Sequence, residues 1–213
     1  MELINKLKTK YGINEPIFFE EIADVVGNYT RGRIYQLIKP ALESGELVRF
    51  GYDCYYIPTQ TPFGTSLLNP RKIIEKKYIS NNGEIFGYYT GLTLLNSFGI
   101  TTQMPNILEI YTNNESTKSR RVEIDNQAVI VKRARATINN SNYREMMILE
   151  LFNLAGEQLK DYDTARKVID YINQNNIRIK DIMRYADAVP NRAIANFMTS
   201  EVPNAIAYRQ RFV

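Results

Sequence analysis

The sequence predicts an α+β protein of two domains, and two observations lead to this prediction. Three helical patterns followed by two β-rich runs fill the first sixty residues, an order typical of a winged helix-turn-helix. The rest of the chain begins with mixed helical and strand patterns and ends in a purely helical stretch. We therefore expect a winged helix-turn-helix at residues 1–60 and a second, α+β domain at residues 61–213.

The composition excludes several kinds of chemistry. The 213 residues include no histidine, which excludes a Ser-His-Asp triad, a Cys-His dyad and every metal site that needs histidine. Cys54 is the single cysteine, so the chain can form no internal disulfide and no four-cysteine zinc site. No dinucleotide-binding or Walker A glycine pattern occurs. Much enzyme chemistry is therefore excluded, and we expect no metal, no cofactor and no catalytic residue.

The sequence also bears on location and charge. The start has no signal-peptide pattern and no apolar run approaches the roughly 18 residues of a membrane helix, so we expect a cytoplasmic protein. Residues 1–60 carry 7 basic and 8 acidic groups, residues 61–135 carry 10 and 6, and residues 136–213 carry 10 and 9. A nucleic-acid site in the first sixty residues must therefore depend on local placement of charge.

The N-terminal elements follow from apolar spacing and from stop signals. Leu3, Ile4 and Leu7 have helical spacing and predict a first helix that ends before Gly12, and a second helix is expected at residues 19–26, before Gly27. Thr30 is a suitable N-cap for a third helix from Arg31 to Ser44. The buried stripe expected for this helix is Ile34, Leu37, Ile38, Ala41 and Leu42.

Two features complete this part of the prediction. Pro40 lies inside the third helical pattern, where proline costs about 3 kcal/mol, so we expect either a kink or two shorter helices. The β-rich runs at residues 47–50 and 54–58 flank a short turn and predict a hairpin, the wing of the motif.

The inward stripe leaves a polar face at the start of the third helix. Arginine can bond guanine through two hydrogen bonds, glutamine can bond adenine, and threonine, tyrosine and lysine can hold phosphate. The alternative is a solvated face, or a winged helix that binds protein and never touches DNA. The residues expected to contact DNA are Thr30, Arg31, Arg33, Tyr35, Gln36 and Lys39 on the helix, with Arg49 and Tyr52 on the wing.

The second domain is expected to have a helix-plus-sheet part, residues 61–141, and a helical part, residues 142–213. Helices are predicted after Asn69-Pro70 and from Thr90 to Phe98. The small antiparallel sheet has expected strands at residues 106–113, 121–124 and 128–132. Four apolar stripes then have helical spacing, at Tyr143, Met147, Leu151 and Leu154 and within residues 165–172, 179–186 and 193–198.

A family resemblance lies in the block from Gly87 to Asn113, which reads GYYTGLTLLNSFGITTQMPNILEIYTN. This block resembles the domain that follows the winged helix in AbiE-type antitoxins of type IV toxin–antitoxin systems and in their bacterial relatives. The stretches YTGL and TQMPN carry the most specific likeness, and the segment YYIP at residues 55–58 is also similar to the family. The likeness covers the chain from about the second helix onward.

The resemblance implies a transcriptional repressor with a second role in phage defence by abortive infection. The winged helix would repress the protein's own operon by binding operator DNA upstream of it. The second domain would act as antitoxin against a nucleotidyltransferase toxin encoded alongside, without requiring a stable complex. The resemblance also implies that the protein is not an enzyme.

Two further sets of residues have alternative interpretations. A basic cluster can contact RNA, DNA or an acidic toxin surface, or can protect a sheet edge from pairing; it comprises Lys118, Arg120, Arg121, Lys132, Arg133 and Arg135. Carboxylates and a lysine on strands can also indicate a metal-dependent nuclease, although the spacing here is unlike the usual motif. That set is Glu109, Glu123, Asp125 and Lys132.

Overall fold

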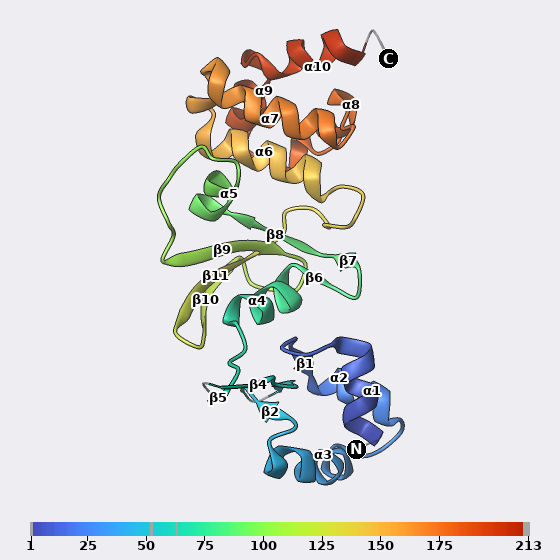
Figure 1. Ribbon diagram of the computed structural model, residues 1–213. Coiled ribbons are helices and arrows are strands. Elements are labelled where there is room, and N and C mark those ends of the chain that lie inside the picture. Colours follow the sequence, from blue (N-terminus) through green and yellow to red (C-terminus); the bar gives the residue numbers. More distant parts are fainter. Residues whose placement is uncertain (1, 52, 63, 211–213) are drawn as a thin grey trace. The chain divides into compact units, whose positions relative to one another are not determined.

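The computed structural model describes residues 2–51, 53–62 and 64–210, and its architecture is α+β, as predicted (Figure 1). The chain divides into two compact units, Met1–Lys76 and Lys77–Val213. The first unit extends beyond the residues 1–60 expected for it because the following segment packs against it. Ser66 Oγ donates to Asn14 Oδ1 at 2.5 Å, and Lys72 Nζ donates to the Asn14 carbonyl at 3.1 Å.

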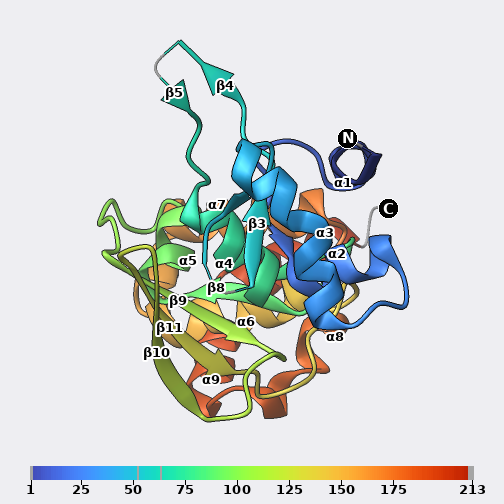
Figure 2. The ribbon, with the colours of Figure 1, turned by 90° about the horizontal axis from the view of Figure 1, so that it is seen from below.

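The first unit combines three helices with a three-stranded antiparallel sheet of order β1-β3-β2. Ile17 pairs with Tyr55 and Val48 pairs with Tyr56, so β3 is the central strand. Figure 2 shows the β4–β5 hairpin, which the sequence did not predict, extending away from the helices of this unit. The elements are α1 (Glu2–Tyr11), β1 (Ile17–Phe18), α2 (Phe19–Val26), α3 (Arg31–Ser44), β2 (Val48–Arg49), β3 (Cys54–Tyr56), β4 (Gln60–Thr61), β5 (Gly64–Thr65) and the start of α4 (Pro70–Tyr78).

Helix α3 is one continuous helix with defined ends. Thr30 Oγ1 accepts a hydrogen bond from the Arg33 backbone N–H at 3.3 Å, and Gly45 ends the helix in the left-handed conformation, with φ of 76°. The helix continues through Pro40, so the prediction of two shorter pieces is wrong. Pro40 and Gln36 are both exposed, and water can therefore satisfy the Gln36 carbonyl that lacks its helical partner.

The core of the first unit fixes which way α3 faces. Ile34, Ile38 and Ala41 are buried as predicted, whereas Leu37 and Leu42 are half-buried. Ile34, Ile38, Ala41 and Leu42 pack with residues of α1, α2, the sheet and the segment before β2, including Leu7, Ile17, Phe19, Ile22, Leu47 and Tyr55. Burial of this stripe leaves the opposite side of α3 free for polar contacts.

The second unit contains a mixed four-stranded sheet of order β10-β11-β9-β8. The pairing of β10 with β11 is antiparallel, as predicted, and β9 also pairs antiparallel with β8, a strand that the sequence did not predict. Strands β9 and β11 are parallel, so the wholly antiparallel prediction is wrong for the central pair. After β9 the chain passes to the sheet edge as β10 and then returns as β11 beside β9. The elements are β6 (Ser80–Asn81), β7 (Glu84–Ile85), β8 (Gly87–Thr90), α5 (Gly91–Ser97), β9 (Ile107–Thr112), β10 (Ser119–Ile124) and β11 (Gln127–Arg133).

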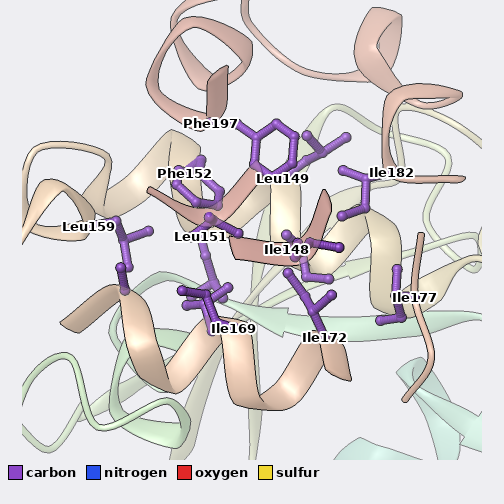
Figure 3. Packing of buried hydrophobic residues seen from close by; sticks show 14 of the residues in the cluster. Ile148, Leu149, Leu151, Phe152, Leu159, Ile169, Ile172, Ile177, Ile182 and Phe197 are labelled. Atoms are coloured by element: carbon purple, nitrogen blue, oxygen red, sulfur yellow. The ribbon is translucent and has the colours of Figure 1, made fainter. Parts of the chain in front are cut away.

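A helical layer follows the sheet, as predicted, and is built around α6. Phe152 and Phe197 meet in its core with ring centroids 5.1 Å apart, among the aliphatic side chains labelled in Figure 3. Leu154 was expected in the buried stripe but is 39% exposed. Since α6 contacts α5, α8, α9 and β8, it is buried on several sides and has no single stripe. The helices are α6 (Tyr143–Ala155), α7 (Tyr162–Gln174), α8 (Ile179–Met183), α9 (Asn191–Thr199) and α10 (Val202–Gln210), with 3-10 turns at Gln158–Lys160 and Ala186–Ala188.

None of the helices in the described part of the chain combines the length and apolar character needed to cross a membrane.

Candidate nucleic-acid interface

The start of α3 presents a row of exposed polar side chains. Ile34 and Ile38 anchor this end of the helix in the core, and most of the polar residues predicted to contact DNA lie outside it. Tyr35 is the exception and is half-buried. The exposed residues from the predicted set are Thr30, Arg31, Arg33, Gln36 and Lys39.

Thr30 and the first turn of α3 form a site suited to an anion. The Thr30 hydroxyl accepts from the Arg33 N–H, which leaves its own hydrogen available to a phosphate oxygen. The N–H groups of a helix's first turn and the helix dipole also favour negative charge. Thr30 therefore both starts the helix and can help it hold a phosphate.

Arg33 and Gln36 lie together on the exposed side of α3. Arg33 Nη1 donates to Gln36 Oε1 at 3.0 Å, one turn further along the helix. Lys39 Nζ lies 3.6 Å from Glu43 Oε1 in an exposed ion pair, a kind of contact that contributes little and is easily exchanged. Arg33, Gln36 and Lys39 can therefore reach a ligand without loss of core packing.

Arg31 is more firmly held than the other exposed residues. Its Nη2 is hydrogen-bonded to Asp53 Oδ1, in the turn that precedes β3. The guanidinium carbon lies 4.3 Å from the centre of the Phe19 ring. The hydrogen bond to the Tyr35 hydroxyl is the largest cause that raises the pKa of Arg31 above its ordinary value, and the charge of Asp53 contributes less. The sequence did not predict the Asp53 contact, because the two residues are brought together only by the fold.

Tyr35 contributes to packing more than to the exposed row. Its ring centroid lies 4.9 Å from that of Phe19, and the side chain packs against the core of the first unit. Its hydroxyl lies 3.5 Å from Arg31 Nη2. The predicted role of Tyr35 in holding phosphate therefore rests on this hydroxyl alone.

Of the two residues predicted to contact DNA from a wing, the structure describes one. Arg49 is exposed on β2, and its Nε donates to the Gly51 carbonyl at 2.9 Å. Tyr52, the other predicted wing contact, lies outside the described residues.

The basic cluster at residues 118–135 does not form one surface. Neighbouring residues of a strand point to opposite faces of a sheet. Arg120 pairs with the buried Val131 and shares its face, whereas Arg121 pairs with Ile130 and lies on the opposite face with Lys132. The predicted strands, residues 121–124 and 128–132, omit Arg120 and Arg133, whereas β10 and β11 include both members of each adjacent pair.

Several members of this cluster also have acidic or polar partners. Arg120 Nε is hydrogen-bonded to the buried Glu115, and Lys132 Nζ lies against Glu109 Oε2 at 2.5 Å. Arg135 Nη2 lies 3.4 Å from the Tyr111 hydroxyl, and Arg133 Nη1 donates to the Ser116 carbonyl at 3.3 Å. Lys118 and Arg121 are exposed. This pattern limits the charge that the cluster can offer to a partner.

Comparison with known proteins supplies no identification. No protein-family model matches the sequence, and no curated protein gives a significant match. The function is therefore inferred below from the side chains of the first unit, and the resemblance of residues 87–113 stays a prediction.

The residues considered for a metal-dependent nuclease are dispersed. Glu109 is paired with Lys132 and its carboxylate lies against Gly91. Glu109 and Glu123 lie on β9 and β10, which are separated by β11. Asp125 belongs to the turn after β10, with φ of 47°. Within residues 2–51, 53–62 and 64–210, no three acidic, cysteine or histidine side chains gather in a way that could hold a metal ion.

A small cavity in the second unit has polar walls. It is lined by Tyr88, Tyr111, Arg135, Glu150 and Tyr185 together with apolar side chains, and has a volume of about 10 Å³. Burial raises the pKa of the Tyr88 hydroxyl well above its usual range. Thr90 Oγ1 donates to Glu150 Oε1 at 2.6 Å. The volume corresponds to about one water molecule, so the cavity fits buried water better than a substrate.

Proposed function

We propose that the first unit binds duplex DNA through the start of α3 and that the protein is a transcriptional repressor of its own operon. The observation that carries this proposal is the row of exposed side chains at the start of α3, on a helix whose other side is anchored in the core. A recognition helix meets the base edges with its N-terminal residues, and its dipole favours the adjacent phosphates.

The element order of the first unit supports the same proposal. Helix α2, a short turn, α3 and the β2–β3 hairpin follow one another as in a winged helix-turn-helix. In this interpretation Arg33 and Gln36 face the base edges, and Thr30 and Lys39 hold phosphates. Arg49 and Tyr52 contact the flanking backbone from the wing.

Charge placement decides how strongly this unit can bind. Residues 1–76 carry 10 basic and 9 acidic groups, so no general attraction to DNA is expected. Specific contacts at α3 must therefore supply most of the affinity. The competing function, a protein-interaction module that never binds DNA, is favoured by this near-neutral charge.

The second unit is proposed to act as the antitoxin of a type IV, AbiE-like module in phage defence. The support is the resemblance of residues 87–113 to that family. The partner would be a nucleotidyltransferase toxin encoded alongside, the setting would be the cytoplasm, and the protein itself would catalyse no reaction. In the cluster proposed to meet a partner, the exposed residues are Lys118, Arg120, Arg121, Arg133 and Arg135.

The first test is DNA binding by the full chain at roughly physiological salt. A specific repressor binds the duplex upstream of its own gene with a dissociation constant near 10⁻⁸ M or tighter, and about a thousandfold better than a shuffled duplex. Arg31→Ala with Arg33→Ala should abolish that preference. Lys8→Ala with Lys10→Ala removes the same charge from α1 and should leave the preference intact. Equal, weak binding of both duplexes would instead favour the protein-interaction module.

The antitoxin role is tested separately in cells. Expression of the adjacent gene alone should arrest growth, and co-expression of this protein should restore it. A variant with Arg31→Ala and Arg33→Ala should still restore growth, because the two roles are assigned to different units. Growth arrest that persists with the wild-type protein would contradict the antitoxin proposal.

A further inference from the structure

The guanidinium of Arg31 is held on three sides. Asp53 Oδ1 accepts a hydrogen bond from Nη2, the Phe19 ring lies 4.3 Å beneath the guanidinium carbon, and the Tyr35 hydroxyl lies 3.5 Å from Nη2. The side chains of Arg31 and Asp53 are nevertheless 54% and 51% exposed. The pair is therefore ordered by its surroundings and still open to a ligand.

The position of Asp53 is itself fixed by the fold. Its backbone carbonyl accepts a hydrogen bond from the Phe19 N–H at 2.9 Å, where α2 begins. Phe19 therefore anchors the acidic residue through its backbone and supports the arginine through its ring. Phe19 is buried, so both partners of the ion pair are positioned by contacts with the same core residue.

This arrangement leaves the remaining donors of Arg31 available. Both hydrogen bonds that the guanidinium makes to described residues use Nη2, and Nη1 and Nε are the donors that a ligand can engage. An arginine fork of this kind matches the N7 and O6 acceptors of guanine in the major groove. Because the side chain is already ordered, binding costs less rotamer entropy. The adjacent carboxylate also repels phosphate, which disfavours contacts that carry no sequence information.

We infer that Asp53 is a specificity-determining positioning residue, which holds Arg31 in place to recognise a guanine of the bound DNA. The inference rests on the proposed function of the first unit. A different role for the same pair is a latch that keeps Arg31 away from DNA. The two roles predict opposite effects of Asp53→Asn on binding to the preferred sequence.

The test compares the full-length wild type and Asp53→Asn on two duplexes, the one upstream of the gene and a shuffled one of equal composition. We expect the variant to bind the upstream duplex about tenfold more weakly, because a misaligned arginine loses its base contact. We expect it to bind the shuffled duplex about threefold more tightly. For the shuffled duplex, the slope of the logarithm of the binding constant against the logarithm of the salt concentration should become steeper by about 0.9, the value for one additional phosphate contact.

Asp24→Asn is the matched control, since it removes an exposed carboxylate from α2 and leaves the Arg31 pair intact. It should not weaken binding to the upstream duplex. Stronger binding of Asp53→Asn to both duplexes would establish the latch and overturn the inference. Unchanged binding to both would overturn it as well. A wild type without preference for the upstream duplex would contradict the proposed function itself, which separates the two failures.

A second measurement identifies the base. Guanines of the upstream duplex are replaced one at a time by 7-deazaguanine, which lacks the N7 acceptor. One position should weaken wild-type binding by about tenfold, and Arg31→Ala should show no penalty there. Asp53→Asn should show a penalty of about twofold at the same position. An equal penalty in the wild type and in Asp53→Asn would overturn the positioning role.

Discussion

Lys76 Nζ lies 2.7 Å from Glu21 Oε2, and both side chains are largely withdrawn from water. The same ammonium donates to the Pro16 carbonyl at 2.6 Å and lies 4.9 Å from the centre of the Tyr11 ring. Glu21 Oε2 also accepts from the Phe18 N–H at 2.8 Å, so the carboxylate links the start of α2 to α4. This ion pair attaches the segment after β5 to the first unit.

Lys76→Met should therefore lower the free energy of unfolding of the first unit by about 3 kcal/mol, because it leaves the buried Glu21 carboxylate without its cation. Urea denaturation followed by a probe in the first unit measures the change. Lys77→Met, the matched control on the same helix, alters an exposed side chain and should change stability by no more than about 0.5 kcal/mol.

The double variant Glu21→Gln with Lys76→Met extends this prediction. It removes both charges and should cost less than the sum of the two single changes, because neither ion is left unpaired. Additive costs would mean that the two side chains do not interact in solution.

The helices of the first unit could be predicted because their signals are local. The Thr30 cap, the stripe containing Ile34 and Ile38, and Gly45 all lie within or beside α3. The ion pairs of Lys76 and Asp53 could not be predicted, because each residue meets its partner only after distant segments of the chain pack together.

The four-stranded sheet of the second unit illustrates a different limit of prediction from sequence. The apolar patterns in the sequence predicted the positions of β9, β10 and β11 to within a few residues. Such a pattern shows which residues of a strand are buried, but not which strands lie next to each other in the sheet. The parallel pairing of β9 with β11 follows from the chain crossing to the edge before it returns. Arg120 and Arg121 lie on opposite faces because both belong to β10, whereas the predicted strand began only at Arg121.

Thr30 offers a prediction about the start of α3. Thr30→Ala removes the oxygen that accepts from the Arg33 N–H and should lower the free energy of unfolding by about 1 kcal/mol. Thr30→Ser retains that oxygen and should stay close to the wild type. Thermal unfolding of the three proteins provides the comparison, and equal stability of the alanine variant would show that the cap is unimportant.

Gly87 offers a prediction about close packing in the second unit. A Cβ at this position would lie 2.0 Å from the Tyr78 carbonyl oxygen and 2.8 Å from that of Tyr111. Both atoms belong to the backbone, so Gly87→Ala should destabilise the second unit by about 3 kcal/mol. Gly32→Ala is the control, because a Cβ added at Gly32 would have no other atoms within 4 Å apart from its immediate chain neighbours and its own helix backbone. That change should stabilise the first unit by about 0.5 kcal/mol, and similar melting shifts for the two variants would refute the steric argument.

Glu115 leads to a prediction about acid stability. The hydrogen bond from Arg120, with further bonds from the Thr117 N–H at 3.0 Å and its hydroxyl at 2.8 Å, lowers the pKa of Glu115 from 4.5 to about 2. A carboxyl group with a lowered pKa stabilises the folded state above its ordinary pKa, and this contribution disappears as the pH falls toward the lowered value. The stabilisation by Glu115 should therefore be complete above pH 4.5 and decline between pH 4.5 and 2.

Arg120→Ala separates this effect from general acid denaturation. The variant lacks the main cause of the lowered pKa, so the wild type should exceed it in stability near neutral pH. That difference should shrink as both proteins are acidified, because protonated Glu115 no longer needs the guanidinium. Urea midpoints measured at several pH values for the two proteins show the trend. A difference that stays constant while the pH falls through 4.5 toward 2 would mean that the Glu115 carboxylate is not the group that Arg120 stabilises.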